Sequence, residues 1–272
     1  MFKIGRAIRR RIVGQMYKSV GKKKMQKIYE GLFHLSLSGM NYGNGGDFNE
    51  SGEMAVLTLI KEQFKNEEKI TVFDVGGNVG NYARSIAGVF GNNTTIYSFE
   101  PSKKTFAQFL ATTAGISNII PNNLGLSDSE NKVTLYTNVD HSGLSSLYNR
   151  ELDHLGIPMS GTEEINLSTI DLYCAQNNID HIHFLKLDIE GHELSALKGA
   201  AKMISQKKID FIQFEFGGCN IDSKTYFKDF FNLLNNSYRI YRILKDGLQE
   251  IPSYNETCEI FITVNYLAQS IN

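Results

Sequence analysis

Apolar runs alternate with amphipathic stretches along most of the chain, and this alternation predicts strands and helices in turn. The run ITVFDV (70–75) is short and apolar enough for a buried strand, and NYARSIAGVF (81–90) has the periodicity of a helix. TTIYSFE (94–100) and SNIIPNNLGL (117–126) predict the next two strands, with a helix over KTFAQFLATTAG (104–115) between them. The pattern predicts an α/β protein with a parallel, doubly wound sheet.

The second half of the chain continues this pattern. IHFLKLDIEG (182–191) and IDFIQFEF (209–216) predict two more strands with one helix between them. That helix carries apolar residues at helical spacing, namely Leu194, Leu197, Ala201 and Ile204. YRIYRIL (238–244) and CEIFITVN (258–265), joined by a turn-rich segment around Gly247, predict an antiparallel pair that closes the sheet.

Two regions depart from the alternation. KVTLYTNVD (132–140) and EINLSTIDLY (164–173) have strand character with no long helix between them, which predicts an insertion beside the functional site. The N-terminal region is predicted to be helical to about Leu37 and is followed by a polar glycine- and asparagine-rich loop. We therefore expect an arm and loop over residues 1–50 and one globular domain over residues 51–272.

The charge of the chain is unevenly distributed. The formal net charge is −1, but residues 1–27 hold ten Lys and Arg and no acid, which leaves about −11 on the remainder. The ten are Lys3, Arg6, Arg9, Arg10, Arg11, Lys18, Lys22, Lys23, Lys24 and Lys27. Ile8, Ile12, Met16 and Val20 recur every four residues among them. This pattern is typical of a helix that lies on an anionic membrane.

Composition indicates an ordinary globular protein, with 42% hydrophobic and 21% charged residues. Its three cysteines are widely separated, which argues against a disulfide framework and a zinc site and favours a reducing cytoplasm. No apolar run approaches the roughly 20 residues that span a bilayer, and no signal-peptide pattern is present. We expect a cytoplasmic protein, with the arm as a candidate contact to the inner membrane face.

The turn after the first predicted strand, GGNVG (76–80), is the first candidate ligand site. Glycines let a ligand approach the backbone, and the following helix offers free N–H groups. The turn lacks the Lys-Ser/Thr pair of a phosphate-binding loop and the full GxGxxG spacing of a dinucleotide site. Asp74 just before it would repel a pyrophosphate, so the turn favours a cationic ligand.

Glu100 ends the next strand, 24 residues after Gly76, where a carboxylate can accept both hydroxyls of a ribose. A turn suited to an amino-acid cation and an acid suited to a ribose together indicate S-adenosylmethionine.

At this point the sequence resembles the FkbM family of class I S-adenosylmethionine-dependent methyltransferases. FDVGGNVGNYA, YSFEPS and FLKLDIEGHELSALKGA carry the resemblance, in that order, and SGE (51–53) and FIQFEFG (211–217) fit the same pattern. The resemblance covers roughly residues 51–218. It implies a seven-stranded sheet of order 3-2-1-4-5-7-6 with the last strand antiparallel, so that residues 51–272 are the methyltransferase domain.

The resemblance also implies roles for particular residues. The methionine moiety would be framed by Asp74, Gly76, Asn78 and Gly80. Glu100 would hold the ribose, and Ser127 and Asp128 would lie by the adenine. The implied acceptor is a hydroxyl of a sugar or glycoconjugate in cell-surface polysaccharide or glycolipid synthesis.

The segment LKLDIEGHE supplies the candidate bases. Asp188 ends a buried strand, where ligands bind in open α/β sheets, and Glu190 and His192 follow it. Methyl transfer from an activated sulfonium mainly requires that the acceptor be positioned and lose a proton. Two close acids could instead bind a divalent cation that orients hydroxyls, although no metal-ligand spacing indicates one.

Alternatives stay open at this point. A nicotinamide oxidoreductase is disfavoured by Asp74 and by the turn's lack of the full GxGxxG spacing. A cofactor-binding scaffold without catalysis is a third possibility, and its biological function would survive the loss of Asp188 and Glu190. Besides a membrane, the basic arm could pack on the acidic body or on a second copy in a homo-oligomer. Nucleic acid is not expected, since no recognition module is present.

Overall fold

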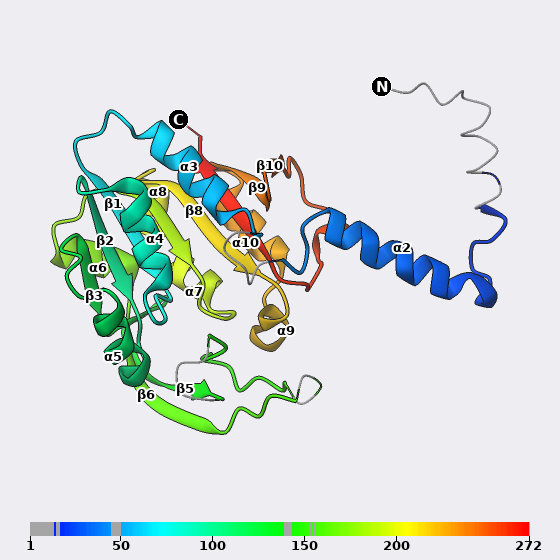
Figure 1. Ribbon diagram of the computed structural model, residues 1–272, viewed down its shortest axis with the longest axis horizontal. Coiled ribbons are helices and arrows are strands. Elements are labelled where there is room, and N and C mark those ends of the chain that lie inside the picture. Colours follow the sequence, from blue (N-terminus) through cyan, green and yellow to red (C-terminus); the bar gives the residue numbers. More distant parts are fainter. Residues whose placement is uncertain are drawn as a thin grey trace. The chain divides into compact units, whose positions relative to one another are not determined.

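The computed structural model describes residues 14, 17–44, 50–138, 143–152, 154 and 156–271. The chain divides into two compact parts, residues 1–42 and residues 43–272 (Figure 1). The division falls eight residues before the predicted boundary at residue 50. In the smaller part, the short helix η1 (Lys23–Met25) leads into α2 (Gln26–Gly39). The predicted stripe residues Ile8, Ile12 and Met16 lie outside the described residues. Val20, the fourth, lies in a turn, so the predicted helix to about Leu37 is interrupted before η1.

The larger part is built on an eight-stranded sheet of order β10-β9-β11-β8-β7-β1-β2-β3. Its strands are β1 (Ile70–Val75), β2 (Thr94–Phe99), β3 (Ile119–Asn122), β7 (Ile182–Leu187), β8 (Ile209–Phe216), β9 (Tyr238–Leu244), β10 (Gly247–Glu250) and β11 (Val264–Ser270). From β3 to β8 all neighbours are parallel, and β11 is antiparallel to both β8 and β9. The α/β class and the mostly parallel sheet are confirmed, and β10 is an additional strand.

The predicted closing pair of strands was partly wrong. The turn at Lys245 and Asp246 joins β9 to β10 in a two-residue hairpin, whereas the partner from the C-terminal segment is β11. That strand starts at Val264 because the chain first forms the short helix η3 (Glu256–Cys258), where the Asn255 side chain accepts the N–H of Thr257. Residues 258–263 therefore do not extend the strand.

Two further predicted strands also end early. Residues 117–126 form β3 and then β4 (Gly125–Leu126), which leaves the main sheet for a second sheet of order β4-β6-β5. This sheet contains β5 (Asn131–Thr137) and β6 (Gly161–Ser168). Residues 170–173, predicted as strand, begin α6 (Ile170–Gln176), because the Thr169 side chain caps that helix by accepting the N–H of Leu172.

The predicted helix over residues 194–204 is broken into α7 (Glu193–Lys198) and α8 (Ala201–Ser205). The Asp171 carboxylate accepts the N–H groups of Lys202 (2.8 Å) and Met203 (3.0 Å), and so caps the second piece. At the break, Gly199 lies so close to the carbonyl of Ser127 that a Cβ there would overlap its oxygen. The break thus fixes the loop after β4 against these helices.

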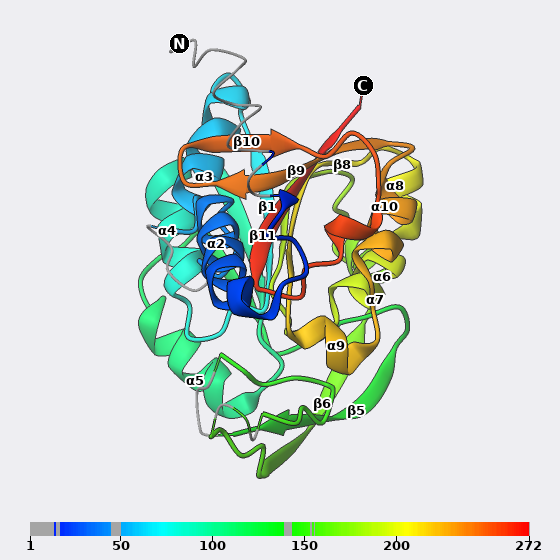
Figure 2. The ribbon, with the colours of Figure 1, turned by 90° about the vertical axis from the view of Figure 1, so that its right-hand side faces the viewer.

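Helices cover both faces of the main sheet (Figure 2). On one face, α3 (Glu53–Gln63), α4 (Asn81–Phe90) and α5 (Lys103–Thr112) pack on Val72 and Ile96 in a fully buried cluster. On the other face, Phe73 contacts Tyr173 of α6, and Phe214 stacks on Phe230 of α10 (Phe227–Leu234). The short helix α9 (Cys219–Ser223) follows β8. Alternating side chains of each strand thus enter two separate cores.

The close approach at Gly199 gives a test of the fold. We expect Gly199→Ala to lower the free energy of unfolding by about 1–3 kcal/mol or more, since backbone must move to admit the methyl group. Gly88→Ala is the matched control, because that glycine is exposed in α4 with open space around it. The control should gain stability by up to about 1 kcal/mol. Equal effects in urea unfolding would contradict the account.

Candidate active site

A cavity of about 490 Å³ opens at the carboxyl ends of β1, β2, β7 and β8. Its floor is the turn Gly76–Asn78 with Glu100, Asp188 and Glu190 around it. The second sheet and the segment between its strands β5 and β6 contribute an apolar wall, made of Leu126, Leu135, Leu147, Ile165 and Leu167. A site at the carboxyl edge of the strands is where open α/β sheets bind ligands.

The glycine turn is shaped by its contact with β7. Gly76 has φ +88°, and a Cβ there would overlap the carbonyl oxygen of Asp188. Only glycine therefore fits between the ends of these two neighbouring strands. Asn78 also has a positive φ, of 47°, and lines the cavity. Its side-chain oxygen is buried with no hydrogen-bond partner among the described residues, which leaves an acceptor for a ligand donor.

Glu100 is held in place beside this turn. One carboxylate oxygen accepts the N–H of Asn78 at 3.0 Å, and the other accepts the N–H of Ser102 at 2.9 Å. Burial raises the pKa of Glu100 to about 7, although both N–H groups act to lower it. The carboxylate is thus oriented toward the cavity and half ionised near neutral pH.

Asp74 lies beneath the turn and does not line the cavity. Its side chain is fully buried and accepts the hydroxyl of Ser98 at 3.1 Å. Burial raises the pKa of Asp74, and the nearby charge of Lys186 lowers it. The structure therefore places Asp74 as a buried neighbour of the site.

Lys186 is the buried ammonium at the centre of this region. Its Nζ lies 3.0 Å from Asp188 Oδ2 and 4.4 Å from the centre of the Tyr82 ring. Burial alone would lower the pKa of Lys186, but Asp188, Asp74 and Glu53 raise it above its ordinary value. Lys186 therefore stays charged. Asp188 pairs with it directly, and the charges of Asp74 and Glu53 also stabilise it.

Glu53 is a cavity residue whose role sequence reasoning missed. It begins α3, is 6% exposed, and accepts the amide N–H of Gln213 at 2.8 Å and the hydroxyl of Ser51 at 3.1 Å. Burial raises its pKa. The signal in the sequence is the SGE segment (51–53), which fits the family pattern but stands ahead of helix α3 and not at the end of a strand.

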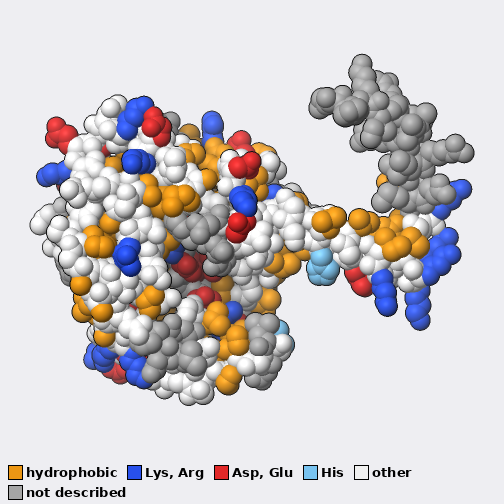
Figure 3. Space-filling view, viewed as in Figure 1, with side chains coloured by type: hydrophobic (Ala, Val, Ile, Leu, Met, Phe, Trp, Pro, Cys, Tyr) orange, Lys and Arg blue, Asp and Glu red, His pale blue; other side chains and the backbone are white. Residues whose placement is uncertain are grey.

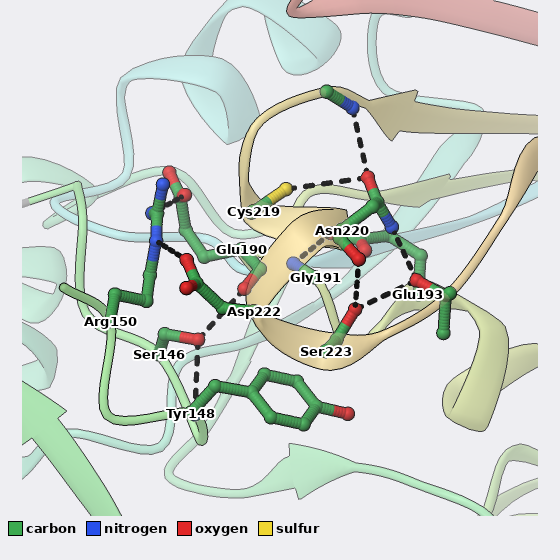
Figure 4. Close-up of polar contacts among 12 residues, drawn as sticks. Ser146, Tyr148, Arg150, Glu190, Gly191, Glu193, Cys219, Asn220, Asp222 and Ser223 are labelled. Atoms are coloured by element: carbon green, nitrogen blue, oxygen red, sulfur yellow. Dashed lines mark hydrogen bonds and ion pairs between the residues drawn. The ribbon is translucent and has the colours of Figure 1, made fainter. Parts of the chain in front are cut away.

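Glu190 is joined to the inserted segment by an ion pair. Arg150 Nη1 lies 2.5 Å from Glu190 Oε2, and Arg150 Nε lies 3.3 Å from Asp222 of α9 (Figure 4). The hydroxyl of Ser146 also donates to the Glu190 carbonyl at 2.8 Å. Burial and Asp188 raise the pKa of Glu190 to about 8, and Arg150 lowers it. This arrangement holds the segment 146–150 at the rim of the cavity.

His192 lines the cavity, and both of its ring nitrogens are engaged. Nε2 lies 2.9 Å from the Ser127 hydroxyl, and Nδ1 lies 3.1 Å from the Tyr148 hydroxyl. Burial lowers the pKa of His192 to about 4, so the ring is neutral at physiological pH. This placement makes His192 a link between the loop after β4 and the inserted segment.

The predicted site residues are therefore only partly together. Gly76, Asn78, Glu100, Asp188, Glu190 and His192 line the cavity, whereas Asp74, Gly80, Ser127 and Asp128 do not. Ser127 reaches it only through His192.

Two groups of side chains have ligand atoms close enough for a metal ion. Glu190, Glu215 and Cys219 lie at the cavity, and His181, His183 and Asp210 lie at the opposite ends of β7 and β8, with ligand atoms within 4.8 Å in each group. In the second group, His183 Nδ1 accepts the N–H of Thr71, and His181 Nε2 lies 2.6 Å from Asp210. Hydrogen bonds thus already explain the second group.

Comparison with known proteins is consistent with this site. The model of the family described as "Methyltransferase FkbM domain" matches residues 74–242. The hexuronic acid methyltransferase AglP of Haloferax volcanii is 23% identical over 167 residues, which cover 61% of this chain and 64% of that protein. The chain thus spans slightly less than two thirds of that relative's length.

Solved structures show weaker similarity. Methyltransferase FkbM from Methylobacillus flagellatus KT has a TM-score of 0.44 at 20% identity, over 74% of this chain and 44% of that chain. The fibrillarin pre-rRNA processing protein of Methanococcus jannaschii also scores 0.44, at 13% identity, over 82% of this chain and 76% of that chain.

Glu193 gives a pH test of the site's architecture. It is fully buried and accepts the N–H groups of Ile189 (2.9 Å) and Gly191 (3.2 Å), and burial raises its pKa from 4.5 to about 7. Between these values the folded state holds a proton that the unfolded state has lost. Stability should therefore fall as the pH rises from 5 to 7, by up to about 1.4 kcal/mol per pH unit for this group.

We expect Glu193→Gln to remove this contribution to the change of unfolding free energy with pH, as measured by urea unfolding at pH 5, 6 and 7. His192 acts in the opposite direction below its ordinary pKa of 6.5, but it does so in both proteins and cancels in the comparison. Identical slopes for the variant and the wild type would show that Glu193 is already ionised in the fold.

Proposed function

Because the chain belongs to the FkbM methyltransferase family, we propose that it transfers a methyl group from S-adenosylmethionine to a hydroxyl of a sugar or glycoconjugate. The family match covers more than half of the chain and includes the turn after β1 and the ends of β2, β7 and β8. The observation that carries the proposal is the excess of carboxylates in the cavity beside a glycine turn.

The cavity residues fit this cofactor. Five acidic side chains line the cavity together with one ammonium, that of Lys186, and they are Glu53, Glu100, Asp188, Glu190 and Glu215. Burial raises the pKa of Glu53, Glu100, Glu190 and Glu215, so a cation bound among them would favour their ionised forms. S-adenosylmethionine carries an ammonium and a sulfonium, which such a cavity stabilises, whereas the pyrophosphate of a nicotinamide dinucleotide would be repelled. The unpaired oxygen of Asn78 is an acceptor suited to the ammonium. Charge therefore disfavours the oxidoreductase alternative.

Each part of the cofactor has residues that would hold it. Glu100 would accept the ribose hydroxyls, and Glu53 and the turn Gly76–Asn78 would face the methionine part. The apolar wall, which includes Leu126 and Leu167, would cover the adenine. When bound, the cofactor supplies an electrophilic methyl group on sulfur, so the protein needs to orient the acceptor and take its proton.

Glu190 is the proposed base. Its pKa of about 8 lies near the working pH, which is where a general base is most effective. Both acids are ion-paired, Asp188 with Lys186 at 3.0 Å and Glu190 with Arg150 at 2.5 Å, so the raised pKa of Glu190 is what favours it over Asp188. His192 has both ring nitrogens engaged by hydroxyls and a pKa of about 4, which makes it the weaker base. A carboxylate oxygen of Glu190 would take the hydroxyl proton, while Arg150 holds the side chain in position.

The acceptor class is the least direct part of the proposal. Its support is the relative AglP, which is a hexuronic acid methyltransferase. The hexuronic acid of that relative carries a carboxylate, whereas the cavity of this chain is lined by five acidic side chains, and each one that is ionised would repel a carboxylate on the acceptor. We therefore propose a neutral sugar hydroxyl as the acceptor.

Cofactor binding is tested by calorimetric titration with S-adenosylhomocysteine, the product of the transfer. Ribose binding requires ionised Glu100, and its pKa is about 7, so the affinity should fall roughly tenfold from pH 8 to pH 6. Glu100→Gln should weaken binding at least tenfold at pH 8 and flatten this pH dependence. Glu164→Gln, at an exposed site on β6, is the matched control. Unchanged affinity in the Glu100 variant would refute the ribose assignment.

The base is tested by turnover, measured as S-adenosylhomocysteine released with a panel of neutral and uronic glycosides. Glu190→Gln should lower kcat by about 100- to 10,000-fold and change cofactor affinity by less than about threefold. His192→Gln should lose less, since that ring only links two hydroxyls. Full turnover in the Glu190 variant would exclude it as the base, and turnover on uronic glycosides alone would overturn the neutral acceptor.

A further inference from the structure

Helix α2 of the smaller part carries an apolar stripe that the sequence analysis did not identify. Ile28, Leu32 and Leu35 follow the spacing i, i+4, i+7, and they are 54%, 42% and 69% exposed. Phe33, 56% exposed, widens the stripe on one side. Large side chains exposed together on one helix are a feature of surfaces that bind a partner.

Positive charge accompanies this stripe. Lys22, Lys23, Lys24 and Lys27 are exposed at the start of the helical region, and Figure 3 shows basic side chains gathered at that end and apolar ones along α2. In sequence, residues 1–27 contain ten Lys and Arg and no Asp or Glu. The arm thus combines apolar side chains with a strong excess of one charge.

We infer that the arm binds the surface of an anionic lipid bilayer, with Ile28, Leu32 and Leu35 inserted among the lipids and the lysines on the headgroups. Each cation near such a surface contributes roughly a fivefold gain in partitioning. Within the described part of the chain, every helix is too short or too polar to cross a bilayer. Contact with the surface is therefore the mode of binding that fits α2.

Other partners fit these observations less well. Two copies joined through α2 side by side would bring twenty basic residues together, and like charges in such blocks repel. A nucleic acid would neutralise the lysines, but its phosphates would leave the apolar stripe in water. A lipid surface satisfies both features at once. This inference is independent of the proposed methyl transfer.

Vesicle sedimentation of the full chain tests the inference. Vesicles of equal parts phosphatidylglycerol and phosphatidylcholine are compared with vesicles of phosphatidylcholine alone, in low and in high salt. The wild type should bind the anionic vesicles at least tenfold more tightly, and high salt should weaken this binding. A double variant, Leu32→Ser with Leu35→Ser, should lose at least tenfold in partitioning to the anionic vesicles.

Leu110→Ser is the matched control, since Leu110 is 45% exposed on α5 of the larger part and should leave vesicle binding unchanged. Circular dichroism melting checks that all variants are folded. Equal binding by the double variant, or equal binding to neutral vesicles, would overturn the inference. The inference would also be overturned if light scattering showed a wild-type dimer that the double variant disrupts, and if neither protein bound vesicles. If the wild type bound anionic vesicles but no S-adenosylhomocysteine, the proposed function would fail and the membrane inference would stand.

Discussion

The ammonium of Lys186 is buried where the ends of three neighbouring elements meet, and each element brings a carboxylate to it. Asp188 comes from the end of β7, Asp74 from β1 and Glu53 from α3. A buried charge is tolerated only when it is paired, so this ammonium permits three acids to gather at one edge of the sheet. Of these three acids, Glu53 and Asp188 line the cavity, and Asp74 lies beneath the turn.

The rest of the site depends on the same meeting of strands. Since Gly76 lies against the carbonyl of Asp188, the turn after β1 and the end of β7 form one continuous floor. Glu100 is then fixed by the N–H of Asn78 in that turn, and the inserted segment is fixed to Glu190 through Arg150. The candidate site thus arises from side chains that parallel strands deliver to a common edge, with the second sheet as its apolar wall.

Sequence reasoning succeeded where local pattern determines structure. The bounds of β1 and α4 were predicted from apolar runs and helical periodicity, and the cavity residues Gly76, Glu100 and Asp188 from their places at strand ends. It failed where a distant side chain decides the outcome. Asp171 breaks one predicted helix by capping its second piece, and Glu53 reaches the cavity from the start of α3, ahead of the first strand. Neither interaction leaves a periodic signal.

Burial likewise separates residues that sequence spacing places together. Asp74 and Asn78 lie in one motif, yet Asp74 is beneath the turn and Asn78 faces the cavity. His192 lies two residues from Glu190, but two hydroxyls hold its ring.

The acidic cavity should select a sulfonium cofactor over a dinucleotide. Calorimetric titration of the wild type with S-adenosylmethionine and, separately, with NAD⁺ measures this selection. We expect saturable binding of S-adenosylmethionine at one site per chain and no binding of NAD⁺. Binding of NAD⁺, or of neither ligand by the folded protein, would contradict this expectation.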